Sequence, residues 1–285
     1  MKIKQTLQDI PFIEDRCFFS IFRSPPKSSI TVYSYNIEND PSFQYLPFFS
    51  DFGPLSLLQI HRFVKMTNKI LNDRSGPVVF WSSFDTQMIS NAVLLASSYR
   101  VIMFQMPPEE AYAPFTHLTL YLKPYRDASS FPSTYDLSVF SCLRGLYKAI
   151  EKGWYNYEMF NEEDWAKYEQ VENGDMNWLI PGKLLAFASP YSTNIIRGGW
   201  KVCTPIDIVP VFRDKKINHV VRLCEKFYDE KAFIENGFNH TELFFIDGSV
   251  PPKDIVTEWL KIAEGESVIA LHCKAGLGRT YVFYI

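Results

Sequence analysis

The amino-acid sequence predicts an α/β fold, and two observations carry this prediction. Apolar runs of strand length alternate with longer runs whose apolar residues recur at helical spacing, which is the pattern of α/β domains. A unit of strand, short loop and helix also occurs twice, at 78–97 and again at 268–285. The chain has 285 residues, which is enough for two modest domains, so we expect one copy of the unit in each.

The first half of the chain predicts alternating strands and helices. In the first helix Leu58, Phe63, Met66 and Ile70 recur near helical spacing, just after the helix entry DFGP at 51–54. The expected elements, in chain order, are strands at 17–22 and 30–35, a helix at 55–71, a strand at 78–81, a helix at 88–99, a strand at 101–104, a helix with Glu109 and Glu110 in its first turn, and a core helix at 135–152 that ends before Gly153.

An acidic stretch at 161–175 separates the two halves, and we place the linker there. Asn161 is a candidate N-cap, and acidic residues follow it in the first turn, where they complement the helix dipole. We therefore expect domains at 1–155 and 177–285, joined by an acidic linker helix at 156–176. The second half predicts, in chain order, an apolar segment at 177–190, a strand at 219–223, a helix near 227–236, a strand at 242–246, a helix whose apolar side spans 255–263, and a strand at 268–271.

Composition and charge narrow the class of protein. The chain is 47% hydrophobic and 21% charged, as in globular proteins with a sizeable core. Its net charge of −3 disfavours a nucleic-acid partner. No apolar run approaches the length of a membrane span, and the N-terminus has no apolar signal core. We therefore expect an intracellular protein without a membrane partner.

The five cysteines indicate a reducing compartment. They stand at 17, 142, 203, 224 and 273 and form neither a C-x-x-C pair nor a metal-ligand spacing. We therefore expect no metal and no other cofactor. Cys142 and Cys224 lie in apolar runs, which predicts that both are core residues.

The most informative stretch is SVIALHCKAGLGRT at 267–280. An apolar strand leads to His272, which we expect to orient the nucleophile, and to Cys273, which attacks as a thiolate stabilised by inward-facing backbone N–H groups. Arg279 can hold two phosphate oxygens in a bidentate fork, and Thr280 can donate to the sulfur or to the leaving oxygen. These residue types predict in-line attack on a phosphate ester and a phospho-cysteine intermediate. The loop positions expected to surround the phosphate are Lys274, Ala275, Gly276, Leu277 and Gly278.

A buried cysteine beside a glycine-rich turn is the plainer interpretation of each of these residues taken singly, but the combined spacing favours the phosphate loop.

In the first copy of the unit, Ser82 or Ser83 falls at the nucleophile position, and Met88 and Ile89 stand where an arginine is needed. A serine without a base or an arginine cannot perform this chemistry. We therefore expect the first copy to be catalytically silent.

Asp247 is the candidate general acid. It follows the predicted strand at 242–246, and Cys273 follows the strand at 268–271. Because ligands of open α/β sheets bind outside the carboxyl ends of strands, the two side chains are expected to converge. Asp247 could protonate the leaving alkoxide and then act as the base for the water that hydrolyses phospho-cysteine, although an aspartate in a turn more often only caps its own backbone.

These residues resemble the Cdc14 family of dual-specificity, cysteine-based protein phosphatases. The shared landmarks are DFGPLSLL, PPEEAY, PYRDAS, VENGDMNWLIPGKLLAF, VVRL, FFIDGS and ALHCKAGLGRT, which together span most of the chain. The resemblance implies two tandem dual-specificity-phosphatase-like domains, of which only the second is catalytic. It also implies that Cys273 is the nucleophile, Arg279 the phosphate-binding arginine and Asp247 the general acid.

The resemblance further implies which substrates are used. The family prefers phosphoserine followed by proline, as left by proline-directed kinases, with a basic residue further on that binds an acidic groove between the domains. Glu169, Glu172 and Asp175 fall on the matching segment, although without the resemblance they read as a solvated helix face. Ala166 stands where another groove acid is expected, which predicts weaker selectivity for the basic residue. A role in cell division implies a nuclear and cytoplasmic location, with nucleolus, spindle and centrosome as candidate sites.

The chain departs from the family after Thr280. The family continues with a glycine and a long apolar helix, whereas here 281–285 follow. We therefore expect a second domain truncated after its phosphate loop, from a truncated gene model or a splice form.

One alternative to an active phosphatase is an inactive pseudophosphatase that binds phosphopeptides or a partner. A rhodanese-type or arsenate-reducing loop is disfavoured by the placement of Asp247 and by the acidic linker. Nothing in the sequence predicts the oligomeric state.

Overall fold

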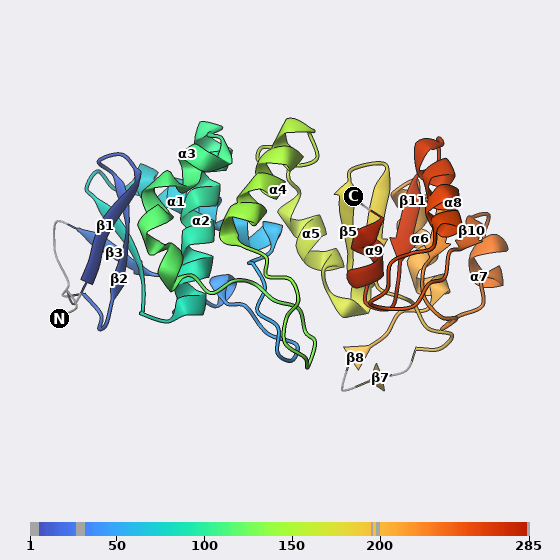
Figure 1. The fold of residues 1–285 in the computed structure, drawn as a ribbon. Coiled ribbons are helices and arrows are strands. Elements are labelled where there is room, and N and C mark those ends of the chain that lie inside the picture. The colour runs from blue at the N-terminus through green and yellow to red at the C-terminus, as the bar shows by residue number, and fades with distance from the viewer. Residues whose placement is uncertain (1–5, 27–31, 195, 198–199, 284–285) are drawn as a thin grey trace. The chain divides into compact units, whose positions relative to one another are not determined.

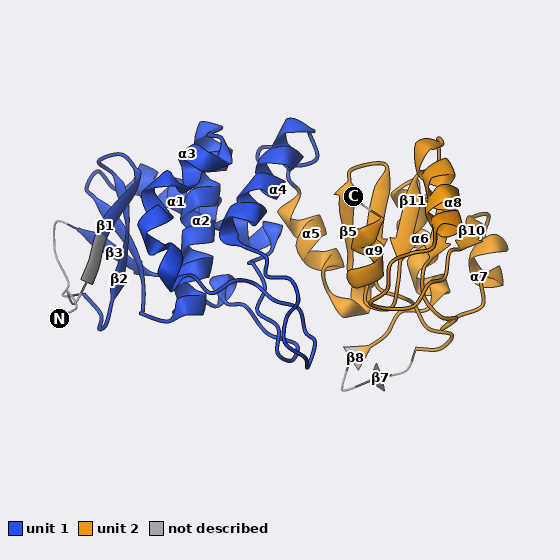
Figure 2. Ribbon diagram, viewed as in Figure 1, with its two compact units in different colours: residues 1–160 blue, residues 161–285 orange. Residues whose placement is uncertain are grey.

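The computed structural model describes residues 6–26, 32–194, 196–197 and 200–283. The chain divides into two compact units, residues 1–160 and residues 161–285 (Figures 1 and 2). The division falls at Asn161, whose side chain accepts a hydrogen bond from the Asp164 amide and so caps the helix Glu162–Tyr168 (α5). An N-cap with acidic residues in the first turn is thus present where the sequence predicted it.

Unit 1 is built on a four-stranded mixed sheet in the order β1-β2-β4-β3. The outer pair β1–β2 is antiparallel, and the other two pairs are parallel. Buried aromatic rings hold the helices to this sheet, for example Phe63 and Phe80 at a centroid distance of 5.2 Å. The elements of unit 1 are β1 (Thr6–Ile13), β2 (Cys17–Phe22), β3 (Tyr33–Asn36), η1 (Pro41–Phe43), α1 (Leu57–Asp73), β4 (Val78–Ser82), α2 (Thr86–Phe104), α3 (Pro108–Tyr112), η2 (Ala113–Tyr121) and α4 (Val139–Glu151).

The strand predicted at 101–104 is wrong, because α2 continues without a break to Phe104. This helix is buried around almost its whole circumference, so its apolar residues form a continuous run instead of a stripe. A continuous apolar run cannot be assigned to helix or strand from its periodicity. The helix ends where Gln105 adopts a left-handed conformation, with φ of 54°. The core helix α4 begins four residues later than predicted, at Val139, after the N-cap Ser138.

The first copy of the strand–loop–helix unit is β4 followed by α2. Ser82 is fully buried at the end of β4, and its hydroxyl donates to the Ser83 carbonyl at 3.3 Å. Asp85 accepts hydrogen bonds from the first amides of α2. This loop therefore ends in a helix cap, and the expectation that the first copy is silent stays a prediction.

Unit 2 contains a five-stranded sheet in the order β10-β9-β11-β6-β5, with β11 at its centre. The strand β11 is parallel to both of its neighbours, β9 and β6. Its side chains alternate between two cores: Ala270 belongs to the cluster that contains Phe212 of α6, and Ile269 and Leu271 belong to the cluster that contains Trp259 of α8. The elements of unit 2 are α5, η3 (Val171–Asn173), β5 (Met176–Ile180), β6 (Leu184–Phe187), β7 (Ile196–Arg197), β8 (Trp200–Lys201), α6 (Pro205–Asp214), β9 (His219–Arg222), α7 (Lys231–Ile234), β10 (Asn239–Glu242), α8 (Lys253–Glu264), β11 (Ile269–His272) and α9 (Gly278–Val282).

The strand predicted at 242–246 is also wrong. The paired strand is β10, which ends at Glu242 opposite Arg222 of β9. Beyond it Leu243 and Phe245 are buried while Phe244 and Ile246 are exposed. This alternation is what a strand produces, but the segment leaves the sheet ladder. Asp247 therefore lies five residues beyond a strand and not at its end. The helix expected near 227–236 is likewise shorter and forms only α7.

Candidate active site

The phosphate-loop sequence begins at the carboxyl end of the central strand of unit 2. β11 ends at His272, and Cys273 follows with a side chain that is 4% exposed. All four residues of β11 are buried, because neighbouring strands cover both edges and helices cover both faces. A rigid, buried strand thus positions the candidate nucleophile, as in other α/β sheets that bind ligands at strand ends.

Two backbone contacts hold the loop against the end of β6. The Ser189 amide donates to the Lys274 carbonyl at 3.0 Å. Gly276 has φ of +71°, and a Cβ there would lie 2.5 Å from the Phe187 carbonyl oxygen. Both the left-handed conformation and the close approach require glycine at this position. The loop residues Lys274, Ala275, Leu277 and Gly278 are exposed.

Arg279 and Thr280 point into the protein at the start of α9, with side chains 3% and 0% exposed. The Arg279 guanidinium donates through Nη1 to the Phe245 carbonyl at 3.0 Å. Its Nε and the Thr280 hydroxyl are buried and have no hydrogen-bond partner among the described residues. Buried polar groups are nearly always paired, so these two donors mark a place for an acceptor supplied by a ligand.

Asp247 lies beside this arginine. Its Oδ1 is 3.6 Å from Arg279 Nε, and it accepts a hydrogen bond from the Gly248 amide at 3.1 Å. The side chain is 69% exposed, so a substrate can reach it. The structure thus brings Asp247 to the phosphate loop, although the strand predicted to deliver it is absent. Glu225, which the sequence did not single out, also faces the arginine, with Oε2 3.7 Å from Nη2.

His272 contacts the loop backbone. Its Nδ1 lies 2.9 Å from the Cys273 carbonyl oxygen, which can only accept, so Nδ1 carries the proton. Its Nε2 therefore accepts from the Tyr228 hydroxyl at 2.8 Å. Burial lowers the pKa of His272 to about 3, so the ring is neutral near pH 7. A neutral ring fixed at both nitrogens orients the Cys273 peptide.

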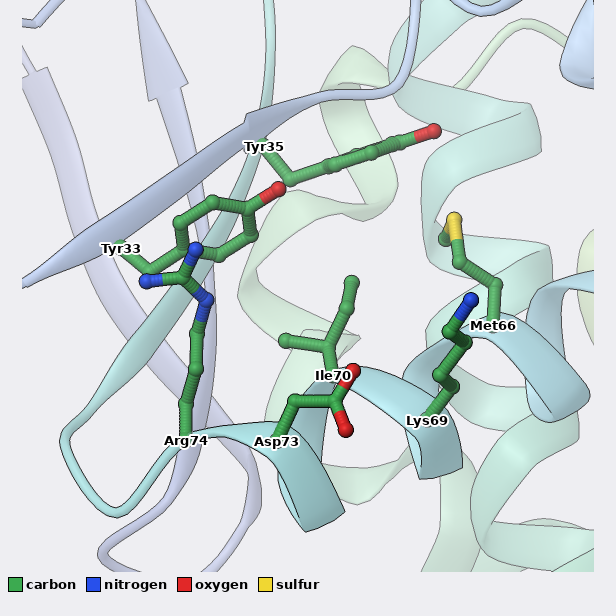
Figure 3. Close-up of a pocket in the computed structure, with 7 residues that line it drawn as sticks. All are labelled: Tyr33, Tyr35, Met66, Lys69, Ile70, Asp73 and Arg74. Atoms are coloured by element: carbon green, nitrogen blue, oxygen red, sulfur yellow. The ribbon is translucent and has the colours of Figure 1, made fainter.

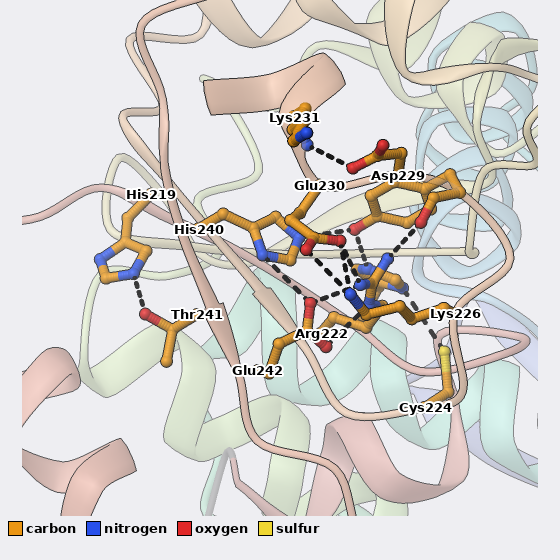
Figure 4. Close-up of polar contacts among 12 residues, drawn as sticks. His219, Arg222, Cys224, Lys226, Asp229, Glu230, Lys231, His240, Thr241 and Glu242 are labelled. Atoms are coloured by element: carbon orange, nitrogen blue, oxygen red, sulfur yellow. Dashed lines mark hydrogen bonds and ion pairs between the residues drawn. The ribbon is translucent and has the colours of Figure 1, made fainter. Parts of the chain in front are cut away.

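The histidine belongs to a buried polar network that sequence reasoning missed (Figure 4). Tyr228 also bonds His240 Nε2, at 3.0 Å. Arg222, fully buried in β9, donates to Glu242 Oε2 at 2.9 Å and to the Tyr228 carbonyl at 2.8 Å. The network therefore ties β9, β10 and the Tyr228 loop around His272. Its only signal in the sequence was an arginine inside the apolar strand HVVRL.

The three predicted groove acids are Glu169, Glu172 and Asp175, and all of them lie in unit 2. Two of them, Glu169 and Asp175, lie close to each other. Burial raises the pKa of Asp175 to about 6, and repulsion by Glu169 adds to this, so these two carboxylates are neighbours. Partial burial and the Asp175 charge also raise the pKa of Tyr281, which places Asp175 near α9. Glu172 is exposed. Its charge is one of the causes, after burial, that raise the pKa of Cys203.

Two features are absent from the described part of the chain. It contains no cluster of three or more His, Cys, Asp or Glu residues that could hold a metal ion. None of its helices is long and apolar enough to cross a membrane.

A surface pocket of about 570 Å³ in unit 1 lacks the groups of the phosphate loop (Figure 3). The Arg74 guanidinium lies over the Tyr33 ring at 4.0 Å, and Asp73 and Lys69 stand on the neighbouring turns of α1. No cysteine lines this pocket, so it offers no thiolate nucleophile.

Comparison with known proteins covers both halves of the chain. Residues 11–149 match the family model for the N-terminal half of dual specificity protein phosphatases, and residues 200–283 match the DSP-PTPase phosphatase of polymorphic toxin systems. A putative protein tyrosine phosphatase from Leishmania major superposes with a TM-score of 0.29 at 22% identity, over 35% of this chain and 63% of that chain.

Curated relatives extend across nearly the whole sequence. Dual specificity protein phosphatase CDC14A of Mus musculus is 41% identical over 274 residues, which is 94% of this chain and 45% of that protein. The tyrosine-protein phosphatase CDC14 homolog of Schizosaccharomyces pombe is 35% identical over 288 residues, 95% of this chain and 52% of that protein. The chain thus spans about half the length of these relatives. The resemblance predicted from the sequence is confirmed: the chain belongs to the Cdc14 family of dual-specificity phosphatases.

Proposed function

We propose that the protein is a cysteine-dependent protein phosphatase that hydrolyses phosphoserine and phosphothreonine before proline, and also phosphotyrosine. One observation carries the proposal: two buried donors that have no hydrogen-bond partner among the described residues, Arg279 Nε and Thr280 Oγ1, lie in the loop that begins with Cys273. A phosphate dianion supplies the oxygen acceptors that these donors lack. The names of the relatives support the same activity.

The reaction proceeds in two steps. The Cys273 thiolate attacks phosphorus in line, and the P–O bond to the leaving alkoxide breaks. Asp247, next to Arg279 and open to solvent, gives that alkoxide its proton. Asp247 then accepts a proton from the water that attacks phospho-cysteine, and the thiolate and inorganic phosphate are released. Arg279 and the loop amides hold the charged phosphoryl oxygens in both steps.

We further propose that the natural substrates are phosphoproteins left by proline-directed kinases during cell division, in the nucleus and cytoplasm, with nucleolus, spindle and centrosome as candidate sites. The close pair Glu169 and Asp175 supports recognition of a basic residue downstream of the phosphate. Glu172, which is exposed, is the third acid proposed to bind this basic residue.

The test is phosphate release by the purified protein from matched peptides. These carry phosphoserine-proline, phosphothreonine-proline, phosphoserine-alanine or phosphotyrosine. We expect turnover that vanadate and thiol alkylation abolish, and that is faster when proline follows. Binding of phosphopeptides without turnover would contradict the enzymatic proposal and favour the phosphopeptide-binding alternative.

Replacing Asp247 with alanine separates its role from that of the nucleophile. An alkoxide needs a proton in order to leave, whereas an aryl oxide leaves readily without one. We expect Asp247→Ala to lower kcat/KM, which reports only the first step, by about a hundredfold to a thousandfold for a phosphoserine peptide and by about tenfold or less for an aryl phosphate. Steady-state kinetics with both substrates measure this, with Asp254→Ala, an exposed acid of α8, as the control. Equal losses with both leaving groups would exclude the general-acid role.

The raised pKa of Asp175 predicts a pH-dependent preference for basic residues. Below about pH 6 the carboxyl holds its proton, and above it the charge is available to bind Lys or Arg. The ratio of kcat/KM for peptides with and without a downstream lysine should rise about threefold to fivefold between about pH 5 and about pH 7.5. Asp175→Asn should flatten this rise, whereas the exposed Glu163→Gln should not. A ratio that stays constant with pH in the wild-type protein would contradict the assignment.

A further inference from the structure

A second cysteine lies next to the nucleophile. Cys224 is 1% exposed and belongs to the same buried apolar cluster as Cys273. Its Sγ is 4.0 Å from Nδ1 of His272, the residue before the nucleophile. After burial, a negative charge on Cys273 is one of the causes that raise the pKa of Cys224, so the two side chains are neighbours. Neither cysteine forms a disulfide in this structure. The chemistry of the proposed phosphatase makes no use of Cys224.

Strand pairing sets the separation of these two residues. β9 and β11 are parallel neighbours with Arg222 opposite His272, and the Leu223 amide donates to the His272 carbonyl at 2.8 Å. Cys273 is the first residue beyond this register on β11 and Cys224 the second beyond it on β9, so the two cysteines are offset by one residue along the strands. With strands about 4.8 Å apart and a rise of about 3.3 Å per residue, their Cα atoms are about 6 Å apart. Disulfides span about 4.4–6.8 Å between Cα atoms, so a bond needs little backbone movement.

The two sulfurs have different surroundings. Cys273 begins the candidate phosphate loop, whose backbone amides are proposed to stabilise a thiolate. Burial raises the pKa of Cys224 to about 11, so it is a neutral thiol at pH 7. An oxidant therefore reacts with Cys273 first, and Cys224 is the thiol at hand to react with the product.

We propose that Cys224 is a resolving cysteine, and that oxidation of Cys273 by a peroxide ends in a reversible Cys224–Cys273 disulfide. The thiolate of Cys273 attacks one peroxide oxygen, the O–O bond breaks, and the sulfenic acid and a hydroxide or alkoxide form. The Cys224 sulfur then attacks the sulfenic sulfur, the S–O bond breaks, and the hydroxyl leaves with the Cys224 proton as water. Sulfur is oxidised by two electrons and the peroxide is reduced by two.

The disulfide has two consequences for the site. It occupies the nucleophile, so no phospho-cysteine can form. It also protects Cys273 from further oxidation to the sulfinic acid, which thiol reductants do not reverse. This inference rests on the proposed function only in requiring a reactive thiolate at position 273.

Mass spectrometry of the peroxide-treated protein tests the bond directly. Trypsin cleaves after Arg222, Lys226, Lys261 and Lys274, so the disulfide would join peptides 223–226 and 262–274. We expect hydrogen peroxide to produce this cross-linked pair in the wild-type protein and dithiothreitol to remove it. Its absence under conditions that oxidise Cys273 would overturn the proposal. Because the readout does not need turnover, a cross-link in a protein without phosphatase activity would refute the proposed function alone.

Recovery of activity tests the protective role. Wild-type protein, Cys224→Ser and Cys224→Ala are each oxidised to the same loss of aryl-phosphate hydrolysis and then reduced with dithiothreitol. Relative to its own starting activity, the wild-type protein should regain at least about threefold more than either variant, in which Cys273 sulfinic acid accumulates. Cys142→Ser, in unit 1, should behave like the wild type. Equal recovery by folded Cys224 variants, judged by thermal melting, would overturn the inference.

Discussion

Replacing Cys273 with serine should lower kcat by about ten thousandfold or more. A serine hydroxyl is not ionised near pH 7, and His272 cannot serve as its base, because it donates from Nδ1 to the Cys273 carbonyl and accepts at Nε2 from Tyr228. The donors of Arg279 and Thr280 that we propose bind phosphate remain in place. Phosphopeptide binding should therefore persist. Titration by fluorescence anisotropy measures the binding, and an assay of phosphate release measures the loss of turnover.

The control for this substitution is Cys142→Ser, a partly buried cysteine of α4 in unit 1. We expect it to keep nearly full activity. Turnover by Cys273→Ser at a rate close to that of the wild type would refute the covalent mechanism. Loss of both binding and turnover with normal melting would show that the sulfur, and not only the loop donors, is needed to hold phosphate.

Replacing Arg279 with lysine should lower kcat/KM by about a thousandfold. The guanidinium is 3% exposed and is anchored through Nη1 on the Phe245 carbonyl, so Nε and Nη2, which face Asp247 and Glu225, are the groups left to bind phosphate. An ammonium group cannot keep the anchor and bind phosphate in a planar fork at the same time. Kinetics with an aryl phosphate and the inhibition constant of vanadate both report the loss.

Arg213→Lys is the matched control. Within the described structure, the guanidinium of Arg213, in α6, donates hydrogen bonds only to Asn236. We expect it to leave both constants close to those of the wild type. If Arg279→Lys stayed within about tenfold of the wild type, the arginine would not be the main phosphate ligand.

The phosphate loop could be predicted because its determinants are local. The strand, the glycines and the Cys273–Arg279 spacing lie within fourteen consecutive residues, 267–280. The network around His272 could not be predicted in this way, because Tyr228 and His240 reach it only through the sheet order β10-β9-β11. Strand order is a property of long-range pairing, which residue patterns along the chain do not encode directly.

The two wrong strands show the limits of hydrophobic pattern. At 101–104 burial around the whole of α2 removes the helical stripe that would have identified it. At 242–246 the residues alternate between buried and exposed without continuing the sheet. Cys224 is buried as predicted, but its nearness to Cys273 follows from the register of β9 and β11, which the sequence could not supply.

Rapid quenching of the reaction under denaturing conditions, followed by mass spectrometry of peptide 262–274, tests the central claim most directly. The variant of choice is Asp247→Ala with an aryl phosphate, because the first step no longer needs the acid while the second lacks its base. The account predicts that one phosphoryl group accumulates on Cys273 within the first turnover. Continued turnover with no phosphoryl group on Cys273, or with one on another residue, would contradict it.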